Sequence, residues 1–392
     1  MQDKIKHIID SCFEDLVNWR EYIHANPELS FQEYKTSEFV ASKLDEMNIP
    51  YQQGIVETGI VALIKGVNPE KQCMALRADL DALPIVEENE VPYKSKIEGV
   101  MHACGHDVHT TCLLGAAKVL NELRDEFEGT VKLIFQPGEE KLPGGASLLI
   151  EAGVLENPKV DKIVALHVYP AMEVGKVGFK EGQYMASCDE LYLNVEGKGG
   201  HAALTDQYHN PVLLIAELLP ALHKYVESLA ADEKFVFAFG KLYADGATNV
   251  IPATAHAEGT LRTMNEKWRL SIHQKMQAFV NSFLEENNAK GVLEIRKGYP
   301  FLNNDEALTR TCKKAAQDYL GTPNVEDMGI RMTAEDFAFY SQELPACFFR
   351  LGVRNQEKGI VHGVHTSQFD IDKQALKHGS GLLAYLALRA LG

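Results

Sequence analysis

The feature of this sequence that most constrains its fold is the order of its secondary-structure patterns, which changes part-way along the 392 residues. Up to about residue 182, short apolar runs bounded by Gly, Pro and Asn alternate with segments whose apolar residues have helical spacing. The runs 131–135 and 163–168, for example, flank a helical pattern at 146–152. This alternation predicts an α/β domain with a mainly parallel sheet covered by helices on both faces, and functional loops at the carboxyl ends of its strands.

A different order occupies residues 183–296. The patterns there predict a strand, a helix, two strands, a helix and a strand, at 190–196, 212–229, 235–242, 254–261, 268–283 and 292–297. This order favours a small α+β domain of the split βαβ, ferredoxin-like kind. The first pattern resumes after Pro300. We therefore expect one α/β domain made of residues 1–182 and 297–392, with a second domain, 183–296, inserted into it.

Further segments complete the predicted α/β domain. Apolar residues at helical spacing predict one long helix over residues 5–24 and another over 36–47. More strands are expected at 59–64, 73–76 and 347–351, and more helices at 109–123, 307–319 and 374–390. The segments 307–319, 347–351 and 374–390 continue the α/β domain after the insertion.

Composition and charge argue against several classes of protein. Apolar residues make up 45% and charged residues 24% of the chain, the balance of an ordinary soluble globular protein. The 55 acidic residues outnumber the 39 basic ones, and the net charge of −16 repels nucleic acid and anionic membranes. No apolar stretch is long enough to span a bilayer, and residues 1–10 lack the apolar core of a signal peptide. We therefore expect a cytoplasmic protein with no nucleic-acid or membrane partner.

The seven cysteines are an odd number scattered along a long chain, which is not typical of a disulfide framework. A cysteine with a special role is therefore expected to be a metal ligand or a nucleophile. Cys104 is the candidate, because it stands in His102-Ala-Cys104-Gly-His106-Asp-Val-His109 just before a predicted helix. A thiolate and an imidazole two residues apart can bind one metal ion or two adjacent ones, although a helix start can also carry such residues by chance.

More polar residues follow predicted strands. Glu139 and Glu140 come directly after the strand 131–135, where adjacent carboxylates are costly unless a positive charge lies nearby or the turn is solvated. His167 lies at the end of the strand 163–168, where a hydrogen-bonded core histidine is the better interpretation of this residue taken alone.

These residues mean more together than singly. Cys104, His106, His167 and the two glutamates supply thiolate, imidazole and carboxylate groups at separate strand ends, as a two-metal hydrolase site requires. One glutamate could bind metal while the other accepts a proton from water.

The motifs of the chain, taken in order, resemble those of the M20 metallopeptidase family. They are His-Ala-Cys104-Gly-His106-Asp, Gln-Pro-Gly-Glu139-Glu140, Leu-His167, Gly-Lys-Gly-Gly-His201-Ala-Ala, Asn249-Val-Ile-Pro, Gly-Thr-Leu-Arg262 and His365-Thr. The resemblance covers essentially the whole chain. It is to the branch containing N-acyl-amino-acid amidohydrolases, hippurate hydrolases, N-acetyl-diaminopimelate deacetylases and plant auxin-conjugate hydrolases. Arg77-Ala-Asp79 and Cys104 mark this branch, since dipeptidases of the wider family carry a His-x-Asp motif and a bridging aspartate there.

The resemblance also implies roles for individual residues. The implied metal ligands are Cys104, His106, Glu140, His167 and His365. Glu139 would be the general base, and the inserted domain would be a lid and dimerisation domain. His201, as a stabiliser of the oxyanion, and Asn249 would reach into the partner subunit's site, whereas Arg262 would hold the substrate carboxylate in its own subunit. Alternatively, His201 is an ordinary residue of a glycine-rich turn and Arg262 is a surface charge.

The implied reaction is hydrolysis of the amide bond of an N-acyl amino acid to a carboxylate and a free amino acid. Two divalent cations, Zn or Mn, would activate water, and Glu139 would take its proton. The expected partners are a small-molecule substrate and a second copy of the chain. The alternatives are a dipeptidase or aminopeptidase of the same family, a non-catalytic metal-dependent binding protein, and a cysteine hydrolase that uses Cys104.

Some residues depart from the pattern or are expected to have lesser roles. The segment Leu204-Thr-Asp-Gln-Tyr-His209-Asn-Pro211 lacks the early proline and histidine that usually follow this motif, which leaves the acyl preference open. Asp79 is expected to orient a ligand histidine through its free ring nitrogen. His102, His109 and the other six cysteines are expected to be structural or to act behind the ligands, with His109 the least certain of these.

Overall fold

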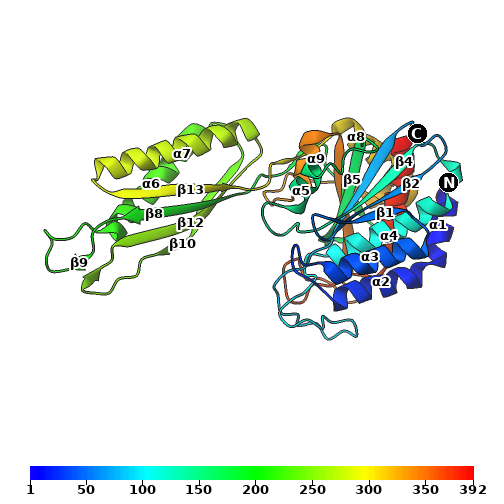
Figure 1. The fold of residues 1–392 in the computed structure, drawn as a ribbon, viewed down its shortest axis with the longest axis horizontal. Helices are drawn as coiled ribbons and strands as arrows, with labels where there is room; N and C mark the ends of the chain where they lie inside the picture. The colour runs from blue at the N-terminus through cyan, green and yellow to red at the C-terminus, as the bar shows by residue number, and fades with distance from the viewer. The chain divides into compact units, whose positions relative to one another are not determined.

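The computed structural model describes residues 1–392, which form two compact units (Figure 1). Unit 1 comprises Met1–Tyr184, Asn303–Ile330 and Asp336–Gly392, and unit 2 comprises Met185–Leu302 and Arg331–Glu335. Unit 2 is therefore an insertion into the sequence of unit 1. The short segment Arg331–Glu335 also belongs to unit 2.

Unit 1 is built on an eight-stranded sheet. Its strands, in spatial order, are β1 (Tyr51–Ile55), β2 (Gly59–Lys65), β4 (Thr130–Gln136), β3 (Cys73–Asp79), β5 (Lys162–Glu173), β16 (Ala346–Arg354), β6 (Val177–Phe179) and β15 (Val325–Asp327). The four central strands, β4, β3, β5 and β16, are parallel, whereas β1 and β2 are antiparallel at one edge and β6 is antiparallel to β16. The predicted mainly parallel sheet is confirmed, and the antiparallel pairs are confined to its flanks.

Helices bury the faces of this sheet. α4 (His106–Glu122) and α10 (Gln374–Leu391) pack against the central strands β3 and β5. Leu76 and Val164 from the strands and Leu113 from α4 are fully buried in the resulting core. The other helices of unit 1 are α1 (Gln2–Ser11), α2 (Phe13–Ala25), α3 (Tyr34–Glu46), α5 (Gly145–Glu151), α8 (Glu306–Leu320) and α9 (Ala338–Glu343).

The single helix predicted over residues 5–24 is wrong, because the chain breaks at Cys12 into α1 and α2. Cys12 leaves the helical conformation at φ −114° and ψ 14°, while its N–H still bonds to the carbonyl of Ile8. Ile9 and Leu16, on either side of the break, both belong to the same core. The apolar period therefore runs through the break, and periodicity alone does not reveal it.

Unit 2 has the split βαβ arrangement that its patterns predict. Its antiparallel sheet has the order β10 (Phe235–Tyr243), β12 (Thr254–Thr263), β8 (Asp189–Glu196) and β13 (Lys290–Lys297). α6 (Pro211–Ala230) and α7 (Glu266–Glu286) pack against each other and against these strands (Figure 1). Alternate residues of β8, such as Leu191 and Leu193, are buried beneath the helices, as expected for a sheet covered on one face.

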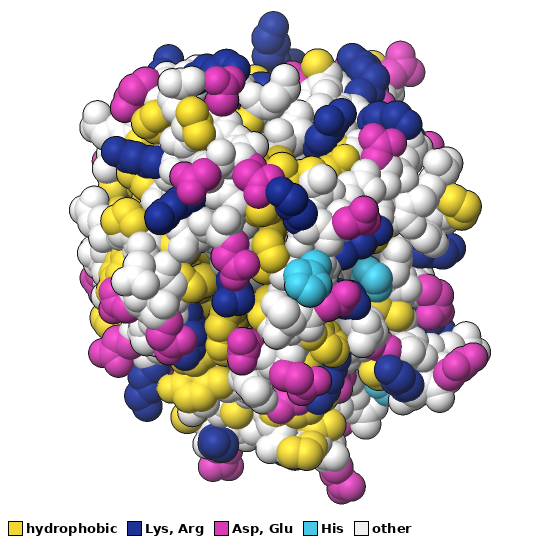
Figure 2. Space-filling model, turned by 90° about the vertical axis from the view of Figure 1, so that its right-hand side faces the viewer, with side chains coloured by type: hydrophobic (Ala, Val, Ile, Leu, Met, Phe, Trp, Pro, Cys, Tyr) yellow, Lys and Arg dark blue, Asp and Glu magenta, His cyan; other side chains and the backbone are white.

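Short elements complete the chain. They are β7 (Gly182–Met185), β9 (Gly200–His201), β11 (Val250–Ile251), β14 (Leu302–Asn304) and the 3₁₀ turns Arg124–Glu126 and Thr322–Asn324. All seven cysteines are free, and six of them are buried. None of the helices is both long and apolar enough to cross a membrane. On the face shown in Figure 2, Lys and Arg side chains are intermixed with Asp and Glu, without a broad area of one sign.

Candidate metal centre

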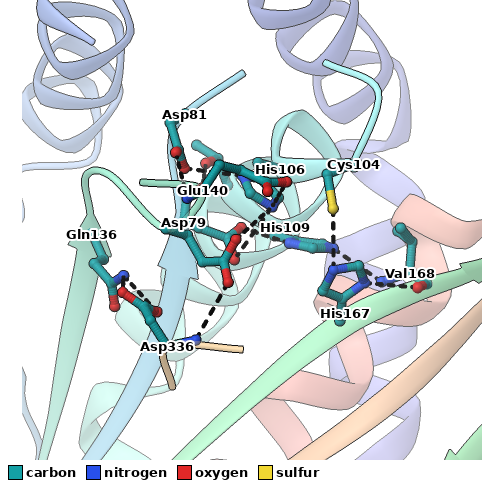
Figure 3. A network of polar contacts seen from close by, with 12 residues as sticks. Asp79, Asp81, Cys104, His106, His109, Gln136, Glu140, His167, Val168 and Asp336 are labelled. Carbon is teal, nitrogen blue, oxygen red and sulfur yellow. Dashed lines mark hydrogen bonds and ion pairs between the residues drawn. The ribbon is translucent and has the colours of Figure 1, made fainter. Parts of the chain in front are cut away.

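The candidate site lies where central strands of unit 1 end (Figure 3). Glu139 and Glu140 follow β4, and Cys104 lies in the loop that leads into α4 at His106. His167 lies within β5, which continues to Glu173 and is longer than the predicted strand. Because β3, β4 and β5 are parallel, their carboxyl ends reach the same edge of the sheet, which brings these distant residues together.

The five predicted metal ligands form one cluster. The Cys104 sulfur lies 3.4 Å from Nε2 of His167 and 3.3 Å from Nε2 of His365. The latter nitrogen is also 3.2 Å from Oε1 of Glu140. Nε2 of His106 lies 4.0 Å from carboxylate oxygens of both Glu139 and Glu140. The ligand atoms form overlapping groups, each with its members within 4.8 Å of one another.

The donor set fits divalent cations. Nε2 of His106 is buried and makes no hydrogen bond. Buried polar atoms without a partner are rare in proteins and call for a ligand or ion. A thiol, three imidazoles and a carboxylate are the ligands that Zn and related metals bind. Burial and the charge of Glu140 raise the pKa of the Cys104 thiol, so that its thiolate needs a nearby cation.

Partners behind the ligands orient two of the imidazoles. Nδ1 of His106 lies 3.1 Å from Oδ1 of Asp81, and Nδ1 of His167 donates to the carbonyl of Val168 at 2.8 Å. Each ring therefore presents Nε2 to the centre of the cluster. Burial, together with the charge of Arg350, holds the pKa of His167 well below its usual value, which leaves a neutral lone pair on that nitrogen.

Asp79 does not orient a ligand histidine in the way expected. Its Oδ1 accepts from Nδ1 of His109 at 2.6 Å, and the N–H of Val168 donates to Nε2 of the same ring at 2.9 Å. Both ring nitrogens of His109 are thus occupied, so this histidine is not a ligand. Asp81, two residues after Asp79 in the sequence, is the carboxylate that holds His106. The Asp-x-Asp spacing at the end of a strand was the available signal.

The loop that carries Glu139 is fixed by a buried carboxylate and a glycine. Glu33 accepts from the N–H of Gly138 at 2.8 Å. Gly138 has a positive φ of 61°, and a Cβ there would lie 2.4 Å from the ring of Phe31. Oε1 of Glu139 accepts from the N–H of Asp336 at 3.3 Å. The position of Glu139, the general-base candidate, is therefore fixed by the backbone contact of the preceding residue and by the hydrogen bond to its own carboxylate.

The other three predicted residues belong to unit 2. The structure brings His201 and Asn249 together, since β9 pairs with β11 and the N–H of Ala202 donates to the carbonyl of Asn249. The N–H of Ala203 donates to Nδ1 of His201 at 3.1 Å, so the proton of this exposed ring lies on Nε2. Arg262 is half-buried in β12 and donates to the carbonyl of Met332 at 3.0 Å.

Comparison with known proteins decides the family. Residues 75–389 match the model of peptidase family M20/M25/M40. The chain belongs to this family. It is 36% identical over 389 residues to the putative amidohydrolase YhaA of Bacillus subtilis, covering 99% of this chain and 98% of that one. It is 37% identical over 386 residues to IAA-amino acid hydrolase ILR1-like 4 of Arabidopsis thaliana, covering 97% of this chain and 86% of that one.

Two further similarities concern the chemistry of this family. The N-acetyl-L-cysteine deacetylase of B. subtilis is 36% identical over 379 residues, which cover 96% of this chain and 88% of the deacetylase. The crystal structure of the YXEP protein of B. subtilis, described as a dinuclear metal binding peptidase from the M20 family, has a TM-score of 0.82. It is 32% identical, with 97% of this chain and 99% of that one covered. The chain is accordingly a metal-dependent amidohydrolase.

Proposed function

We propose that this enzyme hydrolyses N-acyl amino acids, releasing a carboxylic acid and a free amino acid, with two divalent cations, Zn or Mn, in the cluster. The observation that carries the proposal is the convergence of Cys104, His106, Glu140, His167 and His365 on one point, with Glu139 beside them. Cys104, His106 and His167 are buried there, Glu140 is half-buried and His365 is exposed. The names of the similar deacetylase and IAA-amino acid hydrolase support an amide between an acyl group and an amino acid.

Bound cations would supply Lewis acidity, polarising the scissile carbonyl and making water a stronger nucleophile at neutral pH. Glu139 would accept the proton of the attacking water and return it to the leaving amine nitrogen, as the C–O bond forms and the C–N bond breaks. The N–H of Asp336 donates to Oε1 of this carboxylate. The other oxygen, Oε2, lies 4.0 Å from Nε2 of His106, on the side of the cluster.

The residues of unit 2 would complete the site. His201 has its ring N–H on the exposed nitrogen, where it could donate to the carbonyl oxygen as negative charge develops. Arg262 would bind the substrate carboxylate through its planar guanidinium. In this proposal His201 and Asn249 act in the partner subunit's site, Arg262 acts in its own subunit, and residues 183–296 serve as a lid.

A cytoplasmic homodimer joined through the inserted domain is part of the same proposal. Unit 2 has a hollow of about 590 Å³ whose lining includes Leu242, Tyr243 and Val250. These apolar side chains are about half exposed. Exposed apolar areas of this kind are typical of protein–protein interfaces.

The decisive test is Glu139→Gln. The amide keeps the shape of the carboxylate but cannot take a proton, so kcat should fall about 100- to 10,000-fold. Metal content per subunit, measured by mass spectrometry, should equal that of the wild type. Unchanged turnover would overturn the role of Glu139.

Substrate class is tested separately with acetyl, benzoyl and dipeptide amides, after removal and return of Zn or Mn. We expect N-acyl amino acids to be cleaved only when metal is restored. Faster cleavage of dipeptides would favour a peptidase, and full metal occupancy without hydrolysis would favour a binding protein. Activity that survives complete metal removal would overturn the metal mechanism.

A further inference from the structure

Arg77 is a buried arginine in the middle of the sheet, directly behind the cluster. It lies in β3, every residue of which is buried, and its side chain has no exposure to solvent. Because side chains alternate along a strand, Arg77 and Asp79 share one face of β3 while Leu76 and Ala78 face the main core. The guanidinium therefore reaches polar partners rather than the apolar core.

The guanidinium donates hydrogen bonds to three side chains, which lie in three different directions from it. Nη1 donates to Asp79 and Nη2 to Asp336, each at 2.6 Å, and Nε donates to Oε1 of Gln136 at 2.9 Å. This last bond fixes the orientation of the Gln136 amide, whose nitrogen then donates to both oxygens of Asp336 at 2.9 and 2.7 Å. Figure 3 shows Gln136 and Asp336 facing each other beside the cluster.

One arm of this network leads to the general-base candidate. The Asp336 carboxylate is held by Arg77, by Gln136 and by the N–H of Ala146 at 2.9 Å. With its side chain fixed in this way, the backbone N–H of Asp336 is directed at Oε1 of Glu139. The orientation of the Glu139 carboxylate therefore depends on the position of the guanidinium.

The other arm leads to a metal-ligand candidate. Arg77 holds Oδ2 of Asp79, and Oδ1 of the same carboxylate holds Nδ1 of His109. His109 in turn accepts from the N–H of Val168, and the carbonyl of Val168 accepts from Nδ1 of His167. This chain of bonds fixes which nitrogen of each ring carries the proton, and hence which nitrogen of His167 faces Cys104.

We propose that Arg77 is a positioning residue that sets the geometry of the general base and of a metal ligand together, through Asp336 on one side and Asp79 on the other. The inference rests on the proposed function, because it takes Glu139 as the base and His167 as a ligand. A planar guanidinium suits this task, since its fixed fork can bind three acceptors in set directions, whereas an ammonium group cannot.

The first experiment compares Arg77→Lys with Arg269→Lys. Arg269 is a matched control in unit 2: its side chain is also fully buried and is paired with Asp189 and Glu266. The ring nitrogen signals of ¹⁵N-labelled histidines are recorded without metal and after addition of Zn²⁺. In Arg77→Lys, the signals of His109 and His167 should shift from one tautomer to a mixture, whereas Arg269→Lys should keep the wild-type signals.

Metal retention and kinetics give further readouts. We expect Arg77→Lys to lose Zn²⁺ to a chelator and to lower kcat, each by about 10- to 100-fold, with KM little changed. Wild-type histidine signals, metal retention and kcat in a folded Arg77→Lys would overturn the inference. Failure of the proposed function is a distinct result, namely full turnover by Glu139→Gln whatever the histidine signals of the Arg77 variant.

Asp336→Asn keeps the inference testable if Arg77→Lys does not fold. This variant weakens the arm to Glu139 but leaves Asp79 in contact with Arg77. It should lower kcat while the His109 and His167 signals and metal retention stay as in the wild type. An unchanged kcat, or equal damage to both arms, would contradict the two-arm arrangement.

Discussion

At the scale of single residues, the cluster depends on partners that lie behind it. Asp81 accepts from His106, from the hydroxyl of Ser30 at 2.6 Å and from the N–H of Glu140 at 2.9 Å. One carboxylate thereby orients an imidazole and positions the backbone of a neighbouring ligand. Such a residue contributes to metal affinity without touching the metal.

Asp81→Ala is therefore expected to lower metal affinity about 10- to 100-fold, because the ring of His106 and the backbone at Glu140 both lose their acceptor. Competition with a chelating dye measures the affinity. Asp232→Ala, which changes an exposed aspartate in unit 2, is the control and should bind metal normally. Equal affinities for the two variants would contradict the role of Asp81.

Glu33 gives a prediction about pH. Burial, together with the charge of Asp81, raises the pKa of Glu33 to about 7, from 4.5. As pH rises from 4.5 to 7, the unfolded chain loses this proton before the folded chain does, so the wild type loses stability over this range. In Glu33→Gln, the amide oxygen can still accept from Phe31 and Gly138 and the NH₂ group can donate to Thr58.

The free energy of unfolding of metal-free Glu33→Gln, relative to that of the wild type, should therefore rise by up to about 3 kcal/mol between pH 4.5 and pH 8. Urea unfolding at a series of pH values measures this difference. Glu38→Gln, which changes an exposed glutamate in α3, the helix that begins directly after Glu33, should show no such trend. A stability difference for Glu33→Gln that does not vary with pH would refute the assignment.

At the scale of elements, long periodic segments are predictable from the sequence, and short or exposed ones are not. The buried strand β4 and the amphipathic helix α8 were expected within a residue or so of where they lie. β1 was not expected, because three of its five residues are exposed and no apolar run marks it. The break at Cys12 was missed because both flanking helices contact one core.

The residues of the site also differ in whether they can be predicted from the sequence. Glu140 and His167 could be selected because they stand at the ends of predicted strands, and Cys104 and His106 because they precede a predicted helix. His365 is implied only by the resemblance to the M20 family. Asp336 could not be selected, because its partner Arg77 is 259 residues away and only the folded chain brings the two together. The role of Asp81 was assigned to Asp79 for a similar reason: both carboxylates follow one strand, and the choice depends on where α4 places its histidines.

An element-scale prediction concerns Pro220, which lies inside α6 and is exposed. Proline cannot donate to the carbonyl of Ala216, one turn earlier, and its ring crowds that carbonyl. Pro220→Ala should therefore stabilise unit 2 by up to about 3 kcal/mol in urea unfolding followed by circular dichroism. Pro211, at the first position of the same helix, is the control, because proline is favourable there and Pro211→Ala should give no gain.

At the scale of the whole molecule, the proposed chemistry is divided between the two units. Unit 1 carries the clustered residues and Glu139, whereas His201, Asn249 and Arg262 belong to unit 2. If His201 serves the partner subunit's site, a single subunit has no complete site, and activity requires the dimer. Activity should then fall on dilution below the dissociation constant of the dimer, which light scattering can measure independently.

Mixing inactive variants tests this sharing directly. Glu139→Gln and His201→Ala should each be nearly inactive alone. In their mixed dimer, the His201→Ala subunit retains Glu139 and receives the partner subunit's His201, so one of the two sites is complete. With random assortment, about a quarter of wild-type activity should return. Mixing Glu139→Gln with Arg262→Ala should restore none, because both lesions act in their own subunit's site. No rescue in the first mixture, with mixed dimers verified by mass, would place His201 in its own subunit's site.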